Sequence, residues 1–490
     1  MRHVVVLVVA LSLGGTGASA AATPRFGVAG DSGKYGDDSG AFFYSTLADI
    51  GLTENRVTVL WDPDRAAEIA DAPFLDRSLP VAAKNGVRIV FAVYPTTARA
   101  FSGNTRARID EFRSFLRQVA ERYPDVTTYI VGNEPNQPRF WQPQFIARRL
   151  GAQGVAAPAF EHVLAGAYDT LKSVNPNIVV AGVGLSPRGN DSPSAPENVS
   201  RSPVRFLNEL AAEYRRTKRK RPLMDLLSFH PYPNRNDDPT SRGYSWPNAG
   251  IPDLDRIKQA IWDGFHGTAQ PTFAETGRPT KRPPLKFMLD EYARQVEISP
   301  ALGNLYDGAE NVPTVDEETQ AAMYVNVLRR VACDPTVADF MFFHLVDERD
   351  LDRFQSGLLR VDLSHRPSYD AVKGALSSGA GCTGSLHRWR HATGVVGTRV
   401  RFLRGSVRVD VGEEAGAQVV LVPQAAPTAT ARASRAGAVA GPVKLVRAGI
   451  SAALAVPRTA AGRFVVTVLL RATMNPARRQ VVRGPALSLP

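Results

Sequence analysis

The sequence of 490 residues alternates eight times between a short apolar run and a longer amphipathic stretch. Strands that are apolar on both faces are typical of a parallel sheet covered by helices. Eight strand–helix units over about 360 residues predict an α/β fold, a (β/α)8 TIM barrel in preference to an open doubly wound sheet. The eight predicted strands occupy residues 25–30, 55–63, 86–95, 127–134, 177–187, 224–233, 285–293 and 338–348.

The pattern changes near residue 384. From there on, short alternating runs are separated by turns rich in Gly, Pro and Ala, which predicts a small all-β domain of the immunoglobulin-like sandwich type. The predicted organisation is therefore a signal peptide at 1–20, a barrel domain at 21–383 and a basic β-sandwich domain at 384–490.

Charge is distributed unevenly between the two predicted domains. Residues 385–490 contain 16 Arg and Lys against 3 Asp and Glu, about +13, whereas the whole chain carries +12. Such a split indicates two domains with different partners, and an anionic cell-envelope polymer is one candidate partner of the second. Nucleic acid is not expected, because Trp389, Phe402 and Phe464 are too few aromatic residues for base stacking. A solvated basic surface without a partner is the simpler alternative.

The N-terminus has the features of a secretory signal peptide. Arg2 and His3 precede an apolar stretch at 4–13, and the small residues at 18–20 form a cleavage site. The apolar stretch is too short to cross a bilayer, and no transmembrane segment is expected elsewhere. We therefore predict a secreted protein, extracellular or associated with the cell wall.

Two cysteines, Cys333 and Cys382, follow in the exported part of the chain. A disulfide between them is plausible because oxidising compartments preserve such bonds. A metal site at the pair is not expected, since neither belongs to a CxxC motif. In a barrel, the last two helices are neighbours, and both cysteines lie near the ends of those predicted helices.

Polar side chains gather at the C-terminal ends of the predicted strands, where barrel enzymes keep their chemistry. Glu134 precedes Pro135, which cannot donate to a sheet, so Glu134 should stand at the tip of its strand. Taken alone, it could be a solvated turn residue. Glu291, however, ends a strand on the opposite side of the barrel mouth, and two facing carboxylates are what glycosidic bond cleavage needs. The other candidates at strand ends are Arg56, Trp61, Asn133, His230, Tyr232, Asp290, His344, Asp347 and Glu348.

The strand at 285–293 contains two adjacent acids, and alternation places them on opposite faces. Phe287, Leu289 and Glu291 share one face, and Met288 and Asp290 share the other. We expect the bulky apolar residues to point into the barrel, which makes Glu291 the inward acid and places Asp290 in the wall.

Several of these strand ends resemble known motifs. GNEPN followed by RFWQP, then SFHPYP and LDEYA, resemble the fourth-, sixth- and seventh-strand motifs of clan A (β/α)8 glycoside hydrolases. The nearest families are family 39 and the cellulase-like family 5, and the resemblance spans most of residues 25–375.

The resemblance implies a retaining double displacement. It assigns Glu134 as the general acid/base, Glu291 as the nucleophile, and Asn133 as the ligand of the sugar hydroxyl beside the reaction centre. Arg56 resembles the arginine that keeps the nucleophile ionised in this clan, as a nearby cation should. Tyr232 or His230 could donate a hydrogen bond to Glu291.

The sequence also departs from the clan pattern. Phe343 and His344 stand where the eighth strand usually carries a tryptophan that supports the sugar. Asp347 and Glu348 follow and could bind sugar hydroxyls or a basic substituent. For His230 and His344, a role as inner-wall histidines is an equal alternative. The tryptophans could equally pack in the core or stack on sugars; they are Trp61, Trp141 and Trp246.

The predicted function is therefore a secreted, retaining glycoside hydrolase that cleaves O-glycosidic bonds of a polysaccharide or oligosaccharide, without a cofactor or a metal ion. Long loops at 186–203, 233–252 and 292–314 would wall its cleft and set its specificity. The alternative is a non-catalytic glycan- or envelope-binding protein on a glycosidase-like barrel. The altered eighth strand and the basic domain favour this alternative, and the presence of both acids opposes it.

Overall fold

The computed structural model describes residues 23–103, 105–379, 381–403, 406–423, 439–440, 444–446, 450–453 and 462–489. The predicted signal peptide at 1–20 lies outside these residues. Within the described residues, none of the helices combines the length and the apolar character that crossing a membrane requires.

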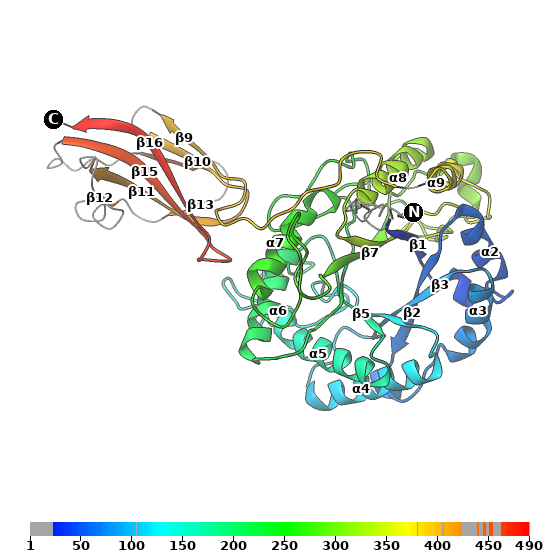
Figure 1. The fold of residues 1–490 in the computed structure, drawn as a ribbon. Helices are drawn as coiled ribbons and strands as arrows, with labels where there is room; N and C mark the ends of the chain where they lie inside the picture. Colours follow the sequence, from blue (N-terminus) through cyan, green and yellow to red (C-terminus); the bar gives the residue numbers. More distant parts are fainter. Residues whose placement is uncertain are drawn as a thin grey trace, which may run out of the picture.

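Eight parallel strands close into a barrel in chain order (Figure 1), and β1 pairs with β8 to complete it. The predicted TIM barrel is thus confirmed. Its strands are β1 Arg25–Ala29, β2 Glu54–Trp61, β3 Arg88–Pro95, β4 Thr128–Val131, β5 Val179–Leu185, β6 Leu226–Phe229, β7 Lys286–Tyr292 and β8 Val337–Phe343.

Helices surround the barrel as an outer ring. In α4 (Thr105–Arg122), Phe112, Phe115, Leu116 and Val119 are buried, as is typical of an amphipathic helix that covers a sheet. Pro73 lies in the first turn of α3, whereas Pro80 lies inside that helix without ending it. The helices are α1 Ser32–Tyr35, α2 Ala41–Ile50, α3 Ala72–Lys84, α4 Thr105–Arg122, α5 Ala156–Val174, α6 Pro203–Arg216, α7 Leu254–Phe265, α8 Glu317–Ala332 and α9 Pro367–Ser377, with short 3-10 turns at Pro63–Arg65, Ile251–Asp253 and Pro300–Leu305.

The two faces of the barrel wall differ in side-chain size, and this corrects one expectation. Phe287 and Leu289 pack outward in the core beneath the helices, whereas Met288 belongs to a small cluster inside the barrel. The reason is that the wide space between sheet and helices needs bulky residues, while the interior is narrow. Asp290 therefore points inward, opposite to the prediction. Glu291 still reaches the mouth because the register of β7 against β8 is irregular between Leu289 and Tyr292.

The C-terminal part forms two antiparallel sheets, ordered β14-β10-β9 and β12-β11-β15-β16, with β13 paired to β11. Their strands are β9 Arg399–Leu403, β10 Ser406–Asp410, β11 Ala415–Pro423, β12 Val439–Ala440, β13 Lys444–Val446, β14 Ile450–Ala453, β15 Gly462–Ala472 and β16 Arg479–Leu489. The small antiparallel domain is thus confirmed, and its immunoglobulin-like type stays a prediction. Strand β16 was not predicted, because Gly484 and Pro485 interrupt its alternation.

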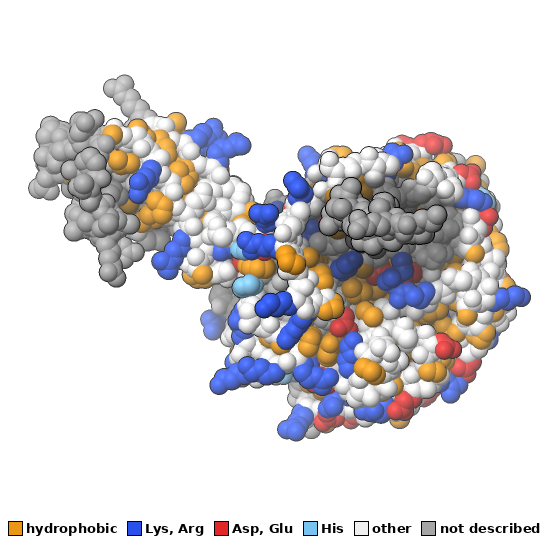
Figure 2. Space-filling model, in the orientation of Figure 1, with side chains coloured by type: hydrophobic (Ala, Val, Ile, Leu, Met, Phe, Trp, Pro, Cys, Tyr) orange, Lys and Arg blue, Asp and Glu red, His pale blue; other side chains and the backbone are white. Residues whose placement is uncertain are grey.

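The sheets lie to one side of the barrel, beyond α6 and α7 (Figure 1). Ion pairs join the two parts: Arg478 to Asp263 at 2.9 Å, and Arg205 to Glu414 at 3.3 Å. On the face seen in Figure 2, the described part of the sheets displays Lys and Arg, whereas the barrel displays both basic and acidic side chains. This distribution agrees with the charge asymmetry of the sequence.

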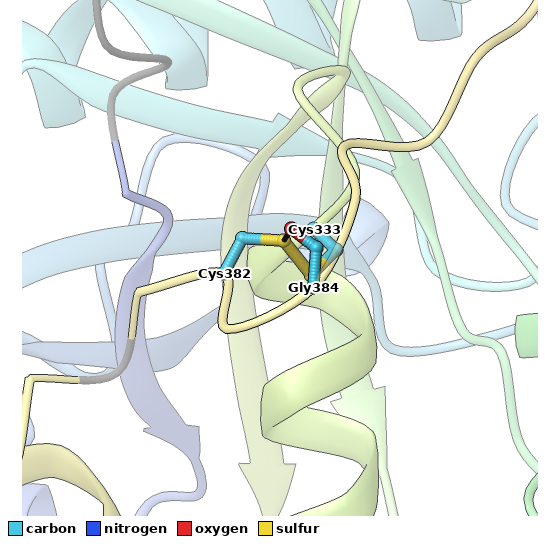
Figure 3. The surroundings of a disulfide bond; sticks show 3 residues. All are labelled: Cys333, Cys382 and Gly384. Carbon is cyan, nitrogen blue, oxygen red and sulfur yellow. Dashed lines mark hydrogen bonds between the residues drawn. A yellow bond between two sulfur atoms is a disulfide. The ribbon is translucent and has the colours of Figure 1, made fainter.

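A disulfide joins Cys333, which caps the C-terminus of α8, to Cys382, which follows α9 (Figure 3). The bond therefore ties the end of the barrel to the segment that leads to the C-terminal sheets. The two cysteines are 49 positions apart, so the chain-entropy model predicts about 4 kcal/mol of stabilisation.

We expect the double variant Cys333→Ser/Cys382→Ser to lose about 4 kcal/mol in urea unfolding, because its unfolded state regains that loop entropy. Wild-type protein kept reduced with dithiothreitol is the matched control and should lose the same amount. An unchanged free energy of unfolding in both samples would contradict this expectation.

Candidate active site

A cavity of about 850 Å³ opens at the C-terminal ends of the barrel strands. Its wall includes eight of the strand-end residues predicted from the sequence: Arg56, Asn133, Glu134, Tyr232, Glu291, His344, Asp347 and Glu348. His230 lies at its floor, fully buried but in contact with both glutamates. Residues from five different strands therefore converge on one site.

Glu134 owes its position to a sharp turn after β4. The strand ends at Val131, three residues before the predicted tip. Gly132 adopts φ +91°, and a Cβ there would lie 2.7 Å from the Phe160 ring, so only glycine fits. Glu134 itself has φ +41°, which is unusual for a non-glycine residue, and its N–H donates to the Gly184 carbonyl at 2.7 Å. Strained backbone of this kind is typical of functional sites.

Glu291 is held at both carboxylate oxygens. The Arg56 guanidinium contacts Oε1 at 3.0 Å, and the Tyr232 hydroxyl donates to Oε2 at 2.8 Å. Arg56 is buried and also donates to Asn133 Oδ1 at 2.6 Å. Bonds of this kind to both oxygens fix the orientation of the carboxylate.

His230 bridges the two glutamates. Its Nδ1 lies 3.1 Å from Glu134 Oε1 and 3.4 Å from Glu291 Oε2, while Nε2 lies 3.3 Å from Asp290 Oδ2. Burial lowers the pKa of His230, but the charges of Glu291 and Asp290 outweigh burial and raise it to about 10. His230 is therefore an imidazolium at neutral pH, and more than a packed inner-wall histidine.

Asp290 completes this network, and its contribution was not expected. Burial raises its pKa, but His230 and Arg56 lower it below its usual value. Ser228 donates to its Oδ1 at 2.6 Å. Ser228 lies on β6 and His230 directly follows it, and their spacing of two residues was a signal that both face the barrel interior.

The two glutamates are close together. One oxygen of Glu134, one oxygen of Glu291 and a nitrogen of His230 all lie within 4.8 Å of one another. Carboxyl groups are about 5–5.5 Å apart in retaining glycosidases and about 6.5–9.5 Å apart in inverting ones, which need room for a water molecule. The spacing fits direct attack by one carboxylate.

The same three donors could in principle hold a metal ion. Arg56 and Tyr232 already occupy both oxygens of Glu291, so an ion would lie beside a fixed guanidinium charge. This donor set therefore favours proton transfer over metal binding. A second group of donors, Glu161, His162 and Glu213, lies on the outer helices α5 and α6, where Arg216 donates to Glu213 at 2.7 Å.

Trp61 lies outside the cavity. Its side chain is fully buried and packs 5.4 Å from the Phe101 ring and 5.2 Å from the Phe112 ring, measured between ring centroids. Alternation along β2 explains this, because Arg56 and Thr58 face the cavity and Trp61 shares the opposite face. The expected contact between Trp61 and a sugar does not fit this geometry, and Trp61 is a core residue.

The end of β8 presents a different aromatic wall. Phe343 and Phe354 meet edge to face at 4.9 Å, and Phe354 lies 5.8 Å from Tyr232. Phe354 comes from the following loop and was not predicted. His344 lies 2.9 Å from the Ala29 carbonyl through Nδ1.

Of the two acids that follow β8, Asp347 is bound by Arg366 and by the Tyr306 hydroxyl at 2.6 Å. Glu348 lies 3.7 Å from His344 and accepts a bond from the Phe354 N–H at 3.1 Å. Both acids line the cavity, but Asp347 is buried and already bound, so it braces the loop. A contact of Glu348 with a sugar stays a prediction.

The raised pKa of His230 makes a testable contribution to stability. Its folded pKa of about 10 lies above its ordinary value of 6.5, so the stabilisation is complete below pH 6.5 and disappears as the pH rises towards 10. The expected loss is up to about 1.4 kcal/mol per pH unit in that window. Urea unfolding at pH 7 and pH 9 should show this slope in wild type and lack it in His230→Gln. Equal slopes in both proteins would refute it.

Comparisons with known proteins add the following. No protein-family model matches the chain, and no curated protein matches it. Among solved structures, it is similar to a family 39 glycoside hydrolase from the gut symbiont Bacteroides cellulosilyticus WH2, with 17% identity, 83% of this chain and 74% of that chain covered, and a TM-score of 0.47.

Two further solved structures are similar. One is a GH5_18 variant from Streptomyces cattleya in complex with Manβ1-4GlcNAc. It is 16% identical, the match covers 76% of this chain and 84% of that chain, and the TM-score is 0.47. The other is a monomeric β-xylosidase from Caulobacter crescentus CB15, with 13% identity, 89% and 95% coverage, and a TM-score of 0.45. The matches are to clan A TIM-barrel glycoside hydrolases, the group that the sequence motifs indicated. At these scores they carry no argument about activity.

Proposed function

We propose that this protein is a secreted, retaining glycoside hydrolase that cleaves O-glycosidic bonds of a polysaccharide or oligosaccharide. The observation that carries the proposal is the pair of carboxylates bridged by His230, with donor atoms within 4.8 Å. The disulfide agrees with an oxidising compartment, which supports secretion.

In the first step, the Glu291 carboxylate attacks the anomeric carbon while the bond to the leaving oxygen breaks. Glu134, protonated beforehand, gives its proton to that oxygen, and a glycosyl ester of Glu291 forms. In the second step, Glu134 takes a proton from water as the water oxygen attacks the anomeric carbon. Glu291 leaves as a carboxylate, and the anomeric configuration is retained after two inversions.

The neighbouring groups have defined roles in this scheme. Arg56 and Tyr232 hold the Glu291 carboxylate in place for attack. Arg56 also occupies Asn133 Oδ1, which leaves the Asn133 amide N–H₂ to donate to a sugar hydroxyl. When Glu134 has lost its proton, the His230 imidazolium can donate to the new carboxylate through Nδ1.

The direct test is a panel of aryl glycosides with activated leaving groups, followed by proton NMR of the first sugar released. We expect turnover of at least one glycoside with retention of configuration. Release of the inverted anomer would contradict the retaining mechanism. Binding of glycans without turnover of any panel member or polymer would favour the alternative of a glycan-binding protein.

A further inference from the structure

A second cavity of about 320 Å³ adjoins the active-site cavity. The two share Pro138 and Asn198 in their walls, so they meet at these residues. Pro138 lies four residues after Glu134, on the loop that leaves β4, and Asn198 lies on the loop that leaves β5. A ligand bound at the glutamates therefore has a path into the second cavity along the Glu134 side of the site.

Arginines line this path. Arg139 lies in the wall of the active-site cavity, and Arg99 and Arg148 lie in the wall of the second cavity, which contains neither Asp nor Glu. We call these three residues the arginine arm. All three are exposed, and among the described residues none of them has an Asp or Glu oxygen within 4.0 Å. Nearby Arg201, in contrast, pairs with Asp191 at 3.2 Å.

Two contacts hold members of the arm in place without neutralising them. Arg148 donates to the Ala195 carbonyl at 2.6 Å, which joins the loops after β4 and β5. The Arg139 guanidinium lies over the Phe140 ring, 5.6 Å from its centroid. The positive charges therefore remain available to a ligand.

The opposite wall of the active-site cavity has the opposite charge. Asp31 follows β1, and Glu348 and Asp352 follow β8, the neighbour of β1 in the barrel. Asp347 and Arg353 also line this side, and Arg366 pairs with Asp347. The three other acids outnumber Arg353, so the β1–β8 side is predominantly acidic, whereas the side of the arginine arm is basic. A neutral glycan gains nothing from this polarity, whereas a glycan with anionic groups on one side of the cleaved bond does.

We propose that the substrate is an anionic glycan, and that the arginine arm binds carboxylate or sulfate groups on its leaving-group side. This inference rests on the proposed function, because Glu134 protonates the leaving oxygen and the arm continues from Glu134. Guanidinium groups bind carboxylate and sulfate oxygens through paired hydrogen bonds, so three of them in one path select for such groups.

The test measures binding in the Glu291→Gln background, so that it does not depend on turnover. Calorimetry would compare three probes: tetragalacturonate for carboxylates, a heparin tetrasaccharide for sulfates, and cellotetraose as a neutral glycan. The double variant Arg99→Ala/Arg148→Ala removes the charge of the second cavity. Arg149→Ala is the matched control, because Arg149 is also exposed but lines neither cavity.

We expect one anionic probe to bind, and its Kd to rise about tenfold or more in the double variant. The Arg149→Ala control should leave that Kd unchanged. The basic C-terminal sheets are identical in every variant, so a difference between variants reports on the arginine arm and not on the sheets. The probe that binds distinguishes carboxylate from sulfate recognition. The proposal would be overturned if the double variant bound the anionic probe as tightly as its parent, or if cellotetraose lost affinity by the same factor. It would also be overturned if neither anionic probe bound. If the anionic probe bound as expected but the wild-type protein hydrolysed no glycan, the proposed function would be refuted and the inference about the arginine arm would stand.

Discussion

Replacing Glu291 by alanine is expected to lower kcat by about 10⁴-fold or more, because the attacking oxygen is lost while the fold remains. The void is small and opens to the cavity, and Arg56 keeps its contact with Asp290 at 3.1 Å. The thermal midpoint should therefore change little. Activity on an activated aryl glycoside should return with azide, which enters the vacated space and yields a glycosyl azide of inverted configuration.

Glu297→Ala is the matched control for this experiment. Glu297 is an exposed acid six residues further along the chain and should be dispensable. If the kcat of Glu291→Ala stayed within a few-fold of the wild-type value, Glu291 would not be the nucleophile. Loss of activity without azide rescue, together with a lowered thermal midpoint, would indicate a structural role.

Replacing Glu134 by alanine is expected to have an effect that depends on the leaving group. With a poor leaving group such as an alkyl alcohol, kcat/KM should fall by about 10³-fold, because the proton donor is missing. With dinitrophenol, which leaves without a proton, kcat/KM should change little, whereas kcat should fall because water is no longer activated in the second step.

Azide also distinguishes the two glutamates. In Glu134→Ala it should attack the glycosyl ester of Glu291 and give a glycosyl azide of retained configuration, the opposite of the Glu291→Ala product. A uniform loss of kcat/KM across all leaving groups would contradict the role of Glu134 as acid and base.

The barrel itself was predictable from the sequence, because each strand–helix unit carries its own periodicity and its own stop signal. Contacts between side chains of different strand–helix units were harder to predict. The pairing of Arg56 with Glu291 joins β2 to β7, and it came from the resemblance to a known clan. The inward direction of Asp290 was predicted wrongly, because apolar residues were assumed to point into a barrel whose wider apolar space lies outside.

Other features had local signals that were not fully used. Alternation along β2 places Trp61 opposite Arg56 and so already excluded it from the mouth. Strand β16 was missed because Gly484 and Pro485 interrupt it. The positions of Phe354 and of the arginine arm depend on the way in which the long loops fold back over the barrel. No periodicity in the sequence indicates that folding.

The central claim is that Glu291 becomes covalently bound to the sugar. The most direct measurement incubates the protein with activated 2-deoxy-2-fluoro glycosides, which stall the glycosyl-enzyme, and locates the adduct by mass spectrometry. The account predicts one added sugar on the tryptic peptide 287–294, with fragmentation placing it on Glu291 and not on Asp290, and no adduct on Glu291→Gln. An adduct on another residue, or none with any sugar of the panel, would contradict it.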